Sequence, residues 1–405
     1  MHNNYSSSKT INTVPVPLEN TKRVMKILGS TPPDTALYVY NMGTLSKLYT
    51  KWNALFPNVK AHYAVKCNPD KYMISTLAKH GANFDCASQT EISTVLSQGV
   101  HPSRIIYANP CKKPSDLAYA FHNSVYVTTF DSACELDKIA ATCAGSATDI
   151  NNVKLILRIY ANDPTAQCVL SNKYGATEDE WDGLLAHAKR LSMNVSGISF
   201  HIGSGACNPG AFTQAIANSR KLYDKASHEY GFDIGVIDIG GGFSVNNIEN
   251  MAGAVNRAVS QYFPTQPVNI IAEPGRYFAE TTADLYTRVI GVRKRNEQID
   301  YTITESLYGS FNCIIYDHNH PIPHAVDIDS ENGTIEIRQQ NSPIKTTIYG
   351  ETCDGIDKIC DGIQLPEVKY GDWLLWKNMG AYTIAGACDF NGILFTRPYR
   401  VYVDM

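Results

Sequence analysis

Lys66 closes the apolar stretch Tyr63-Ala64-Val65, at the end of a strand-like run where a solvent-facing lysine is not expected. An amine held at the end of a buried strand can form a Schiff base with an aldehyde. A lysine with a buried alkyl stem and an ammonium group in solvent has the same sequence signature. Lys66 alone therefore identifies no function, and its meaning depends on the residues that the fold brings to it.

Further along the chain, the glycine run Gly240, Gly241 and Gly242 is suited to binding an anion. Without a Cβ, the N–H groups of such a run can approach a phosphate closely. A tight turn would use the same glycines, so the run is informative only together with its neighbours. The other residues that suit a phosphate are Ser204, Gly275 and Arg276.

Glu273 follows the apolar residues Ile270-Ile271-Ala272, where a buried carboxylate is costly unless it has a partner. Against a pyridine nitrogen it would keep that nitrogen protonated, which makes the ring an electron sink. Paired with an arginine it would be structural. His201 could stack on a flat ring or belong to the core, and Asp85 could orient Lys66 or cap a helix. The amine, the anion cradle and the buried acid together predict a pyridoxal-phosphate enzyme.

Composition excludes several classes of protein. The 405 residues are 44% hydrophobic and 18% charged, with a net charge of −4, as in ordinary globular proteins. No basic run predicts a nucleic-acid partner, no apolar run reaches the roughly 18 residues of a membrane span, and the polar segment before residue 36 has no signal-peptide core. The eleven cysteines include no Cys-x-x-Cys pair, which favours reduced thiols. We expect a cytoplasmic protein without a metal site.

Eight β-rich runs recur, with helix-compatible segments between most of them. They span residues 62–66, 83–88, 105–109, 125–130, 154–160, 195–203, 236–243 and 269–277. Eight alternating strands and helices over roughly 230 residues predict an α/β fold, a (β/α)8 barrel of the TIM type. A doubly wound sheet is the alternative, but no Gly-x-Gly-x-x-Gly follows the first strand.

After about residue 283 the pattern changes to short β-rich segments, at 284–294, 300–304, 333–339, 344–349, 372–377 and 381–385. These predict an antiparallel β domain, which the strand-like run Ala36–Tyr40 could join from the other end of the chain. The expected division is a flexible segment 1–20, a discontinuous β domain of 21–45 and 283–405, and a barrel of 46–282.

The candidate residues follow the ends of predicted strands, where TIM barrels place their active sites. In strand order they are Lys66; Asp85 and Ser88; Arg158; His201 and Ser204; Gly240 to Gly242; and Glu273 with Arg276. Cys353 and Asp354 lie in a predicted loop of the β domain. They are either a surface turn or residues that act on a site elsewhere.

Ten segments resemble the eukaryotic ornithine decarboxylases, in order and with that family's spacing. They are Tyr63–Asn68, Phe84–Ser88, Ile106–Lys112, Phe200–Gly205, Asp238–Phe243, Ala272–Tyr277, Tyr308–Cys313, Tyr316–His318, Thr352–Gly355 and Asn378–Thr383. The resemblance covers the chain from about residue 36 onward. The family is the barrel-type (fold type III) group of pyridoxal-phosphate decarboxylases, with an alanine-racemase-like barrel and a C-terminal β domain.

The resemblance implies a role for each candidate in binding pyridoxal 5'-phosphate. Lys66 would hold the aldehyde, Glu273 the ring nitrogen, and His201 would stack on the ring. The residues implied for the phosphate are Ser204, Gly241, Arg276 and Tyr382.

The resemblance also implies a head-to-tail homodimer with shared active sites. Cys353 and Asp354 of one subunit would reach the cofactor of the other, where Cys353 would protonate the carbanion left after loss of carbon dioxide. Asp317 would bind the distal amino group of a cationic substrate, and Tyr316 and Phe390 would line the substrate pocket.

Three positions depart from the family pattern. Glu351 stands where the family usually has proline, Thr304-Glu305-Ser306-Leu307 replaces an Asn-Asp-Gly-Val-like stretch, and Ser244 follows Phe243 where proline and glycine are common. An altered loop beside an intact catalytic set indicates a changed substrate more than a lost activity.

Three functions are therefore compatible with the sequence. The leading one is decarboxylation of L-ornithine to putrescine in polyamine synthesis. The second is decarboxylation of a larger or modified amino acid in specialised, alkaloid-type metabolism. The third is an inactive regulator like the antizyme inhibitors, which the retained catalytic residues disfavour. Whether an antizyme binds is left open.

Overall fold

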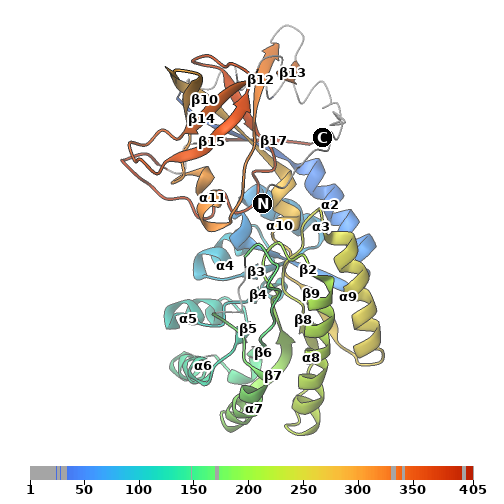
Figure 1. Cartoon of the computed structure of the whole chain (residues 1–405). Helices are drawn as coiled ribbons and strands as arrows, with labels where there is room; N and C mark the ends of the chain where they lie inside the picture. Colours follow the sequence, from blue (N-terminus) through green and yellow to red (C-terminus); the bar gives the residue numbers. More distant parts are fainter. Residues whose placement is uncertain are drawn as a thin grey trace.

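The computed structural model describes residues 24, 28, 34–146, 148–168, 173–329, 334–339, 343–394 and 398–404. A barrel ringed by helices forms one end of the molecule in Figure 1, and a β domain forms the other. The predicted flexible segment 1–20 lies outside the described residues. The domain boundaries drawn from the sequence stay predictions.

Eight parallel strands close into a barrel in chain order, which confirms the predicted TIM-type barrel and excludes the doubly wound sheet. The strands end earlier than most of the predicted runs, because the residues that follow them form loops at the barrel mouth. Their bounds are β2 (Val59–Ala64), β3 (Asn83–Cys86), β4 (Ile105–Tyr107), β5 (Val127–Phe130), β6 (Lys154–Arg158), β7 (Asn194–Ser199), β8 (Val236–Asp238) and β9 (Asn269–Ala272).

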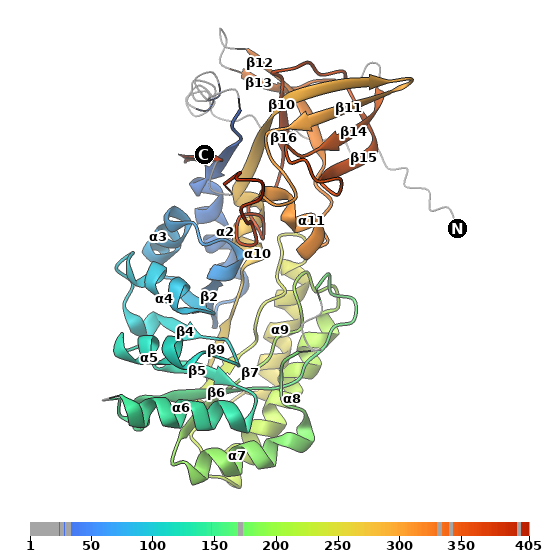
Figure 2. The same ribbon diagram turned by 90° about the vertical axis from the view of Figure 1, so that its left-hand side faces the viewer.

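Helices surround the barrel (Figure 2) and begin at residues that the sequence marks as helix starts. Asn41, Asp70 and Ser88 accept hydrogen bonds from backbone N–H groups at the starts of the first three helices. Among the described residues, no helix is long and apolar enough to cross a membrane. The helices are α2 (Met42–Leu55), α3 (Lys71–His80), α4 (Gln89–Leu96), α5 (Pro114–His122), α6 (Ala133–Gly145), α7 (Trp181–Arg190), α8 (Pro209–His228) and α9 (Ile248–Tyr262).

The β domain is a mixed sheet, not the purely antiparallel one that was predicted. β1 pairs in parallel with β17, and β11 pairs in parallel with β14. The short helices α10 (Arg276–Ala279) and α11 (Cys313–Tyr316) lie between this sheet and the barrel (Figure 1). The strands are β1 (Leu37–Asn41), β10 (Ala283–Arg295), β11 (Gln298–Ile303), β12 (Pro323–Asp329), β13 (Thr334–Ile337), β14 (Ile344–Tyr349), β15 (Lys358–Leu365), β16 (Trp373–Trp376) and β17 (Tyr399–Val403).

One predicted strand of this domain, residues 381–385, is wrong. These residues form bends that lead into a turn, because Tyr382 adopts a left-handed backbone conformation with φ of 55°, which interrupts a strand. Three strands, β12, β15 and β17, were not predicted. Their sequences include a proline start and an Asp361-Gly362 interruption that hide the alternating pattern.

The last strand of the chain is tied to the turn that follows Lys66. Asp70, fully buried, accepts hydrogen bonds from the Tyr402 hydroxyl at 2.7 Å and from Arg400 Nη1 at 3.3 Å. The Asn68 side chain accepts the Asp70 N–H at 3.0 Å and donates to the Gly380 carbonyl at 2.7 Å. The β domain thereby fixes the loop that presents Lys66.

We expect Asp70→Ala to destabilise the fold by about 2–4 kcal/mol, because it removes a helix cap and leaves Tyr402 and Arg400 without their acceptor. Asn208→Ala is the matched control, since Asn208 caps α8 without such partners, and it should cost about 1 kcal/mol. Denaturant unfolding of both variants measures the difference. Equal losses would show that the contact with the last strand contributes nothing.

Candidate active site

Lys66 lies two residues beyond the strand end, so its predicted place within the strand is wrong. β2 ends at Ala64, and Val65–Cys67 form a 3-10 turn. The Lys66 Nζ lies 3.3 Å from Asp85 Oδ2, and its side chain is 38% exposed toward the cavity that it lines. The enclosing protein acts to lower the pKa of Lys66, but the carboxylates of Asp85 and Glu273 outweigh this effect and raise it.

A cluster of buried acids surrounds this amine. Asp85, Asp238 and Glu273 are all buried at the ends of β3, β8 and β9. Burial raises the pKa of Glu273, and the neighbouring carboxyls of Asp238 and Asp85 raise it further. Lys66 and Arg158 oppose this rise. Asp238 was not among the predicted site residues, although its place directly before the glycine run was a usable signal.

His201 is held as a neutral ring at the same mouth of the barrel. Its Nδ1 accepts the Gly203 N–H at 3.0 Å, so in the neutral ring the proton is assigned to Nε2. Burial lowers the pKa of His201 well below its usual value, and the charges of Lys66 and Arg158 lower it further. A flat, uncharged imidazole therefore faces the cavity that it lines.

The glycine run brings three loops into contact. Gly240 has φ of +66° and donates its N–H to Asp238 Oδ1 at 2.9 Å, so this N–H is already used within the protein. A Cβ on Gly241 would lie 2.8 Å from His201 Nε2 and 2.9 Å from the Glu273 carbonyl oxygen. A side chain there would push His201 and Glu273 apart, so glycine is required for the packing of the site.

Arg276 organises a second polar group. Its Nη2 lies 2.5 Å from Asp317 Oδ1 and donates to Ser204 Oγ at 3.1 Å, while its guanidinium lies 5.2 Å from the centre of the Tyr382 ring. No acceptor among the described residues contacts its buried Nε. A Cβ on Gly275 would lie 2.8 Å from that of Cys67, so the Lys66 turn packs directly on this loop.

The two groups meet in one cavity of about 250 Å³. One group carries the Lys66 amine, which can react with an aldehyde, and the other carries the Arg276 guanidinium, which can bind a phosphate. The lining residues are Lys66, Cys168, His201, Ser204, Asn312, Tyr316, Asp317, Tyr382 and Gly386.

Sequence reasoning missed the loop after β6 as part of this site. Gln167 Nε2 donates to the Asp317 carbonyl, and Cys168 Sγ lies 3.8 Å from Asp317 Oδ1. Neither residue belongs to a motif that suggests chemistry. The only signal available was their position after a barrel strand, where functional loops lie.

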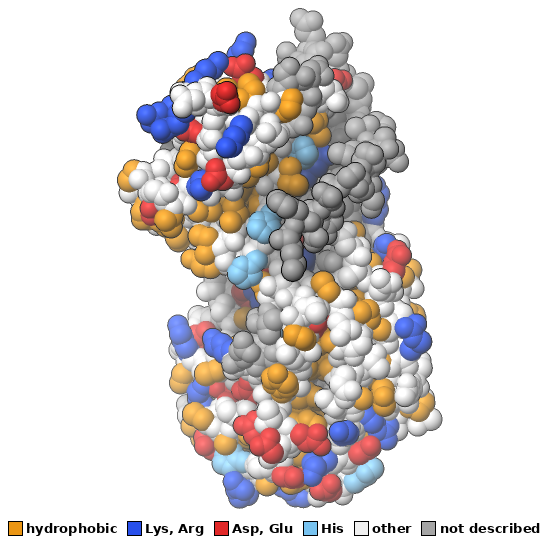
Figure 3. All heavy atoms as spheres, viewed as in Figure 1, with side chains coloured by type: hydrophobic (Ala, Val, Ile, Leu, Met, Phe, Trp, Pro, Cys, Tyr) orange, Lys and Arg blue, Asp and Glu red, His pale blue; other side chains and the backbone are white. Residues whose placement is uncertain are grey.

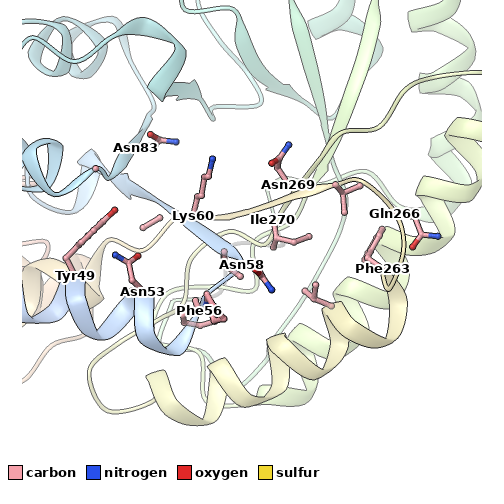
Figure 4. Close-up of a pocket in the computed structure, with 16 residues that line it drawn as sticks. Tyr49, Asn53, Phe56, Asn58, Lys60, Asn83, Phe263, Gln266, Asn269 and Ile270 are labelled. Atoms are coloured by element: carbon pink, nitrogen blue, oxygen red, sulfur yellow. The ribbon is translucent and has the colours of Figure 1, made fainter.

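A larger pocket, of about 680 Å³, opens at the opposite end of the barrel. Figure 4 shows Tyr49 and Asn53 of α2 beside Lys60, Asn83 and Asn269, which come from three strands. Its lining has amides and one lysine but no carboxyl, imidazole or thiol group. The groups able to move protons are therefore gathered at the smaller cavity.

The cavity that Lys66 lines has no contribution from Cys353, Asp354 or Phe390 of the same chain. Cys353 is exposed, with its thiol 3.4 Å from Asn391 Oδ1. The Tyr308 hydroxyl donates to Asp354 Oδ2, which lowers the pKa of Asp354. The Tyr308 ring stacks on Phe390, with 3.9 Å between the ring centres. These residues form a separate group on the β domain.

Two of the departures from the family pattern contact each other. The Glu351 N–H donates to the Glu305 carbonyl at 3.3 Å, a bond that a proline at position 351 could not make. The buried Glu305 carboxylate accepts the Ser310 N–H at 2.9 Å, and burial raises the pKa of Glu305 to about 7. The altered residues therefore form one unit beneath the Cys353 loop.

With this geometry in place, comparison with known proteins identifies the family. Residues 42–280 match the model of the pyridoxal-dependent decarboxylases, pyridoxal binding domain. The chain belongs to this family. It is 40% identical over 390 residues to antizyme inhibitor 2 of Xenopus laevis, covering 92% of this chain and 82% of the relative. It is 40% identical over 402 residues to the ornithine decarboxylase of Rattus norvegicus, with coverages of 93% and 82%.

Solved structures agree with this assignment. The arginine decarboxylase of Paramecium bursaria Chlorella virus superposes with a TM-score of 0.87 at 38% identity, over 95% of this chain and 100% of that one. The protein is thus a fold type III decarboxylase that depends on pyridoxal phosphate. The site fits this cofactor. The amine of Lys66 lines the cavity, and so do Ser204, Asp317 and Tyr382, which contact the Arg276 guanidinium. The buried Nε of Arg276 has no partner among the described residues, and the acid Glu273 is buried.

We expect the neutral His201 to make the fold sensitive to acid. Below about pH 6.5 the unfolded imidazole takes up a proton, whereas the folded one, with its lowered pKa, does not. The free energy of unfolding should therefore decrease as the pH is lowered, by about 1.4 kcal/mol per pH unit for each such histidine. His62, whose pKa burial lowers to about 4, adds a second contribution.

The variant His201→Gln should lose one of these two contributions, while His62→Gln loses the other and serves as the control. Unfolding free energies measured between about pH 5 and 7 give the slopes. An unchanged slope in His201→Gln would mean that this ring is protonated in the folded protein.

Proposed function

We propose that the protein decarboxylates a cationic amino acid, L-ornithine foremost, to form putrescine and carbon dioxide. Asp317 carries this proposal. Its carboxylate is buried, lines the cavity with Lys66, and has one oxygen, Oδ2, that no donor among the described residues contacts. Such an oxygen suits an ammonium group. The named activities of two relatives, on ornithine and on arginine, both concern amino acids with a cationic side chain.

Bound pyridoxal phosphate supplies an aldehyde and a ring that accepts the electrons released when carbon dioxide leaves. Lys66 would hold the aldehyde, with Asp85 Oδ2 at 3.3 Å to orient its amine and accept a proton. Glu273 would hold a proton at the ring nitrogen, and the neutral His201 would lie against the ring face. The phosphate would be bound by Ser204, Gly241, Arg276 and Tyr382.

The Arg276–Asp317 ion pair suits both the phosphate of the cofactor and the ammonium group of the substrate. A phosphate on Arg276 and an ammonium on Asp317 would each replace one half of a pair whose atoms are 2.5 Å apart. Two opposite charges that are already buried together make this exchange less costly than burying each alone. The pair thus prepares one cavity for an anion and a cation side by side.

We further propose a head-to-tail homodimer in which Cys353 of one subunit protonates the substrate Cα in the other. Cys353 is exposed and lies outside its own cavity. The β domain also carries four exposed apolar side chains, Ile315, Tyr316, Ile322 and Ile356. Figure 3 shows hydrophobic side chains gathered at the lower left of the β domain. An exposed apolar patch of this kind is typical of a protein interface.

A larger or modified substrate is the second candidate, and the contact between Glu351 and Glu305 favours it. This contact changes the base of the loop that carries Cys353 and Asp354, the residues that would face the substrate. The likeness to an antizyme inhibitor keeps a regulatory role as a possible outcome of the test below. The proposed cytoplasmic location fits the eleven unpaired cysteines. The proposed place in polyamine synthesis follows from putrescine as the product.

We expect carbon dioxide release from ornithine to exceed that from lysine, arginine and larger diamino acids. Asp317→Asn should raise the KM for ornithine roughly ten- to a hundredfold, because it removes a charge-assisted contact. Glu280→Gln is the matched control, since Glu280 also contacts Arg276, at 3.2 Å, but does not line the cavity. Poor turnover of ornithine beside good turnover of another amino acid would refute the proposed substrate. Failure to bind pyridoxal phosphate would favour the regulator.

The dimer predicts that two inactive variants restore each other. Lys66→Ala and Cys353→Ala each lose activity alone, but a mixed dimer has one site with both residues intact. Random mixing should recover about a quarter of wild-type activity, since half of the dimers are mixed and each has one working site of two. No recovery, with mixed dimers shown to form, would place both residues in the same subunit's site.

A further inference from the structure

A two-residue turn of the β domain places Asn391 beside the Cys353 thiol. Phe390 and Ile393 exchange both backbone hydrogen bonds across Asn391 and Gly392, at 3.2 and 2.8 Å. The two central residues have left-handed backbones, with φ of 51° and 75°. A turn of this type requires positive φ at both central positions, which asparagine followed by glycine adopts readily. The local sequence therefore fixes the turn and the place of the Asn391 side chain.

The turn makes two adjacent contacts to the residues proposed to act in the other subunit's site. Cys353 Sγ lies 3.4 Å from Asn391 Oδ1, and within the described part of the chain this is the thiol's only hydrogen bond. The Phe390 ring lies parallel to the Tyr308 ring, with 3.9 Å between the centres and 4° between the planes. The Tyr308 hydroxyl in turn donates to Asp354. One turn therefore orients both Cys353 and Asp354.

The Cys353 side chain depends on this contact for its direction. It is exposed in the single chain, and a cysteine side chain has three staggered rotamers. An acceptor for the S–H selects one of them. Without the Asn391 amide, the proton that the thiol carries would have no fixed direction.

An asparagine amide also suits a partner whose charge changes. Its oxygen accepts hydrogen bonds and its nitrogen donates two. A thiol that gives up its proton changes from donor to acceptor, and a half-turn of the amide about its last bond presents the nitrogen in place of the oxygen. A carboxylate in the same place could only accept, and it would repel the thiolate.

We propose that Asn391 is the positioning residue for the proton donor Cys353, and that its amide serves the sulfur both before and after proton transfer. This inference rests on the proposed role of Cys353. Before transfer, the Asn391 oxygen accepts the S–H and sets its direction. The proton then forms the new C–H bond with the electron pair on Cα, and the pair of the S–H bond stays on sulfur. The Asn391 nitrogen donates to this thiolate until a proton from solvent restores the thiol.

Two substitutions at position 391 separate the two roles and keep the turn. Asn391→Gly removes the amide and leaves a residue that adopts positive φ freely. Asn391→Asp keeps an acceptor for the S–H but offers no donor to the thiolate. Asn296→Gly is the matched control, since Asn296 also has positive φ, of 50°, in the two-residue loop between β10 and β11.

The infrared S–H stretch tests the contact without any reference to activity. The spectrum of each holoenzyme minus that of the same protein with Cys353→Ser isolates one thiol among eleven. The stretch should lie at a higher frequency in Asn391→Gly than in the wild type, because a hydrogen bond weakens the S–H bond. Asn391→Asp and Asn296→Gly should keep the lower frequency. The same frequency in Asn391→Gly and the wild type would overturn the proposal.

The products of ornithine turnover test the role in proton transfer. A proton added at Cα gives the diamine, whereas a proton added to the cofactor gives, after hydrolysis, an amino aldehyde and the amine form of the cofactor. Asn391→Gly and Asn391→Asp should both raise the aldehyde share roughly three- to tenfold, the effect of one lost hydrogen bond. The KM for ornithine should stay near that of the wild type, and Asn296→Gly should give the wild-type aldehyde share.

The outcomes distinguish this proposal from the proposed function. An unchanged aldehyde share in Asn391→Gly would refute the positioning role, and an unchanged share in Asn391→Asp alone would refute the donation to the thiolate. If the protein decarboxylates no amino acid, the proposed function falls, and the S–H frequency still supports or refutes the contact between Asn391 and Cys353.

Discussion

The balance of buried charge at the mouth of the barrel is the constraint on which the rest of the structure depends. Each ion taken out of water costs several kcal/mol unless opposite charges and hydrogen bonds surround it. Lys66, Asp85, Arg158, Asp238 and Glu273 meet this condition only as a group. They come from five different strand ends or following turns, and only a closed barrel brings five strand ends to one point. The fold and the charge cluster therefore require each other.

The β domain forms the other wall of the same cavity. The Tyr382 N–H donates to the Cys67 carbonyl at 2.9 Å, and Asn68 bonds to Gly380. Both contacts hold the turn of Lys66 against a loop far along the sequence. The Arg276–Asp317 pair makes a similar link between the end of β9 and α11. A barrel without this domain would have the amine and the buried acids but no wall opposite them.

The barrel could be predicted because its signal is local and repeated. Parallel strands buried on both faces give apolar runs, and a polar residue after each run marks the mouth. The turn of Lys66 could not be predicted in this way. The residues on either side of the lysine, Val65 and Cys67, are apolar, and a buried strand and a buried 3-10 turn can both have apolar residues there. Tyr382 was placed in a strand, since nothing in its sequence announces a left-handed backbone. The pairing of Arg276 with Asp317 depends on tertiary contact alone.

The residues proposed for the cofactor and those proposed for the substrate lie in different parts of the molecule, and this limits what each motif can reveal. Residues proposed for the cofactor lie mainly on the barrel. There Gly241 has no room for a Cβ, and replacing a single buried acid would disturb the balance of charge. Residues proposed for the substrate lie on loops of the β domain, and some of the hydrogen bonds that hold these loops join backbone groups. The amide of Glu351 bonds to the Glu305 carbonyl, and the Glu305 carboxylate holds the start of the segment that leads into α11 and Asp317. A change at 304–307 or 351 therefore acts on both substrate-facing loops and leaves the charge cluster untouched, so the substrate can change without loss of the cofactor.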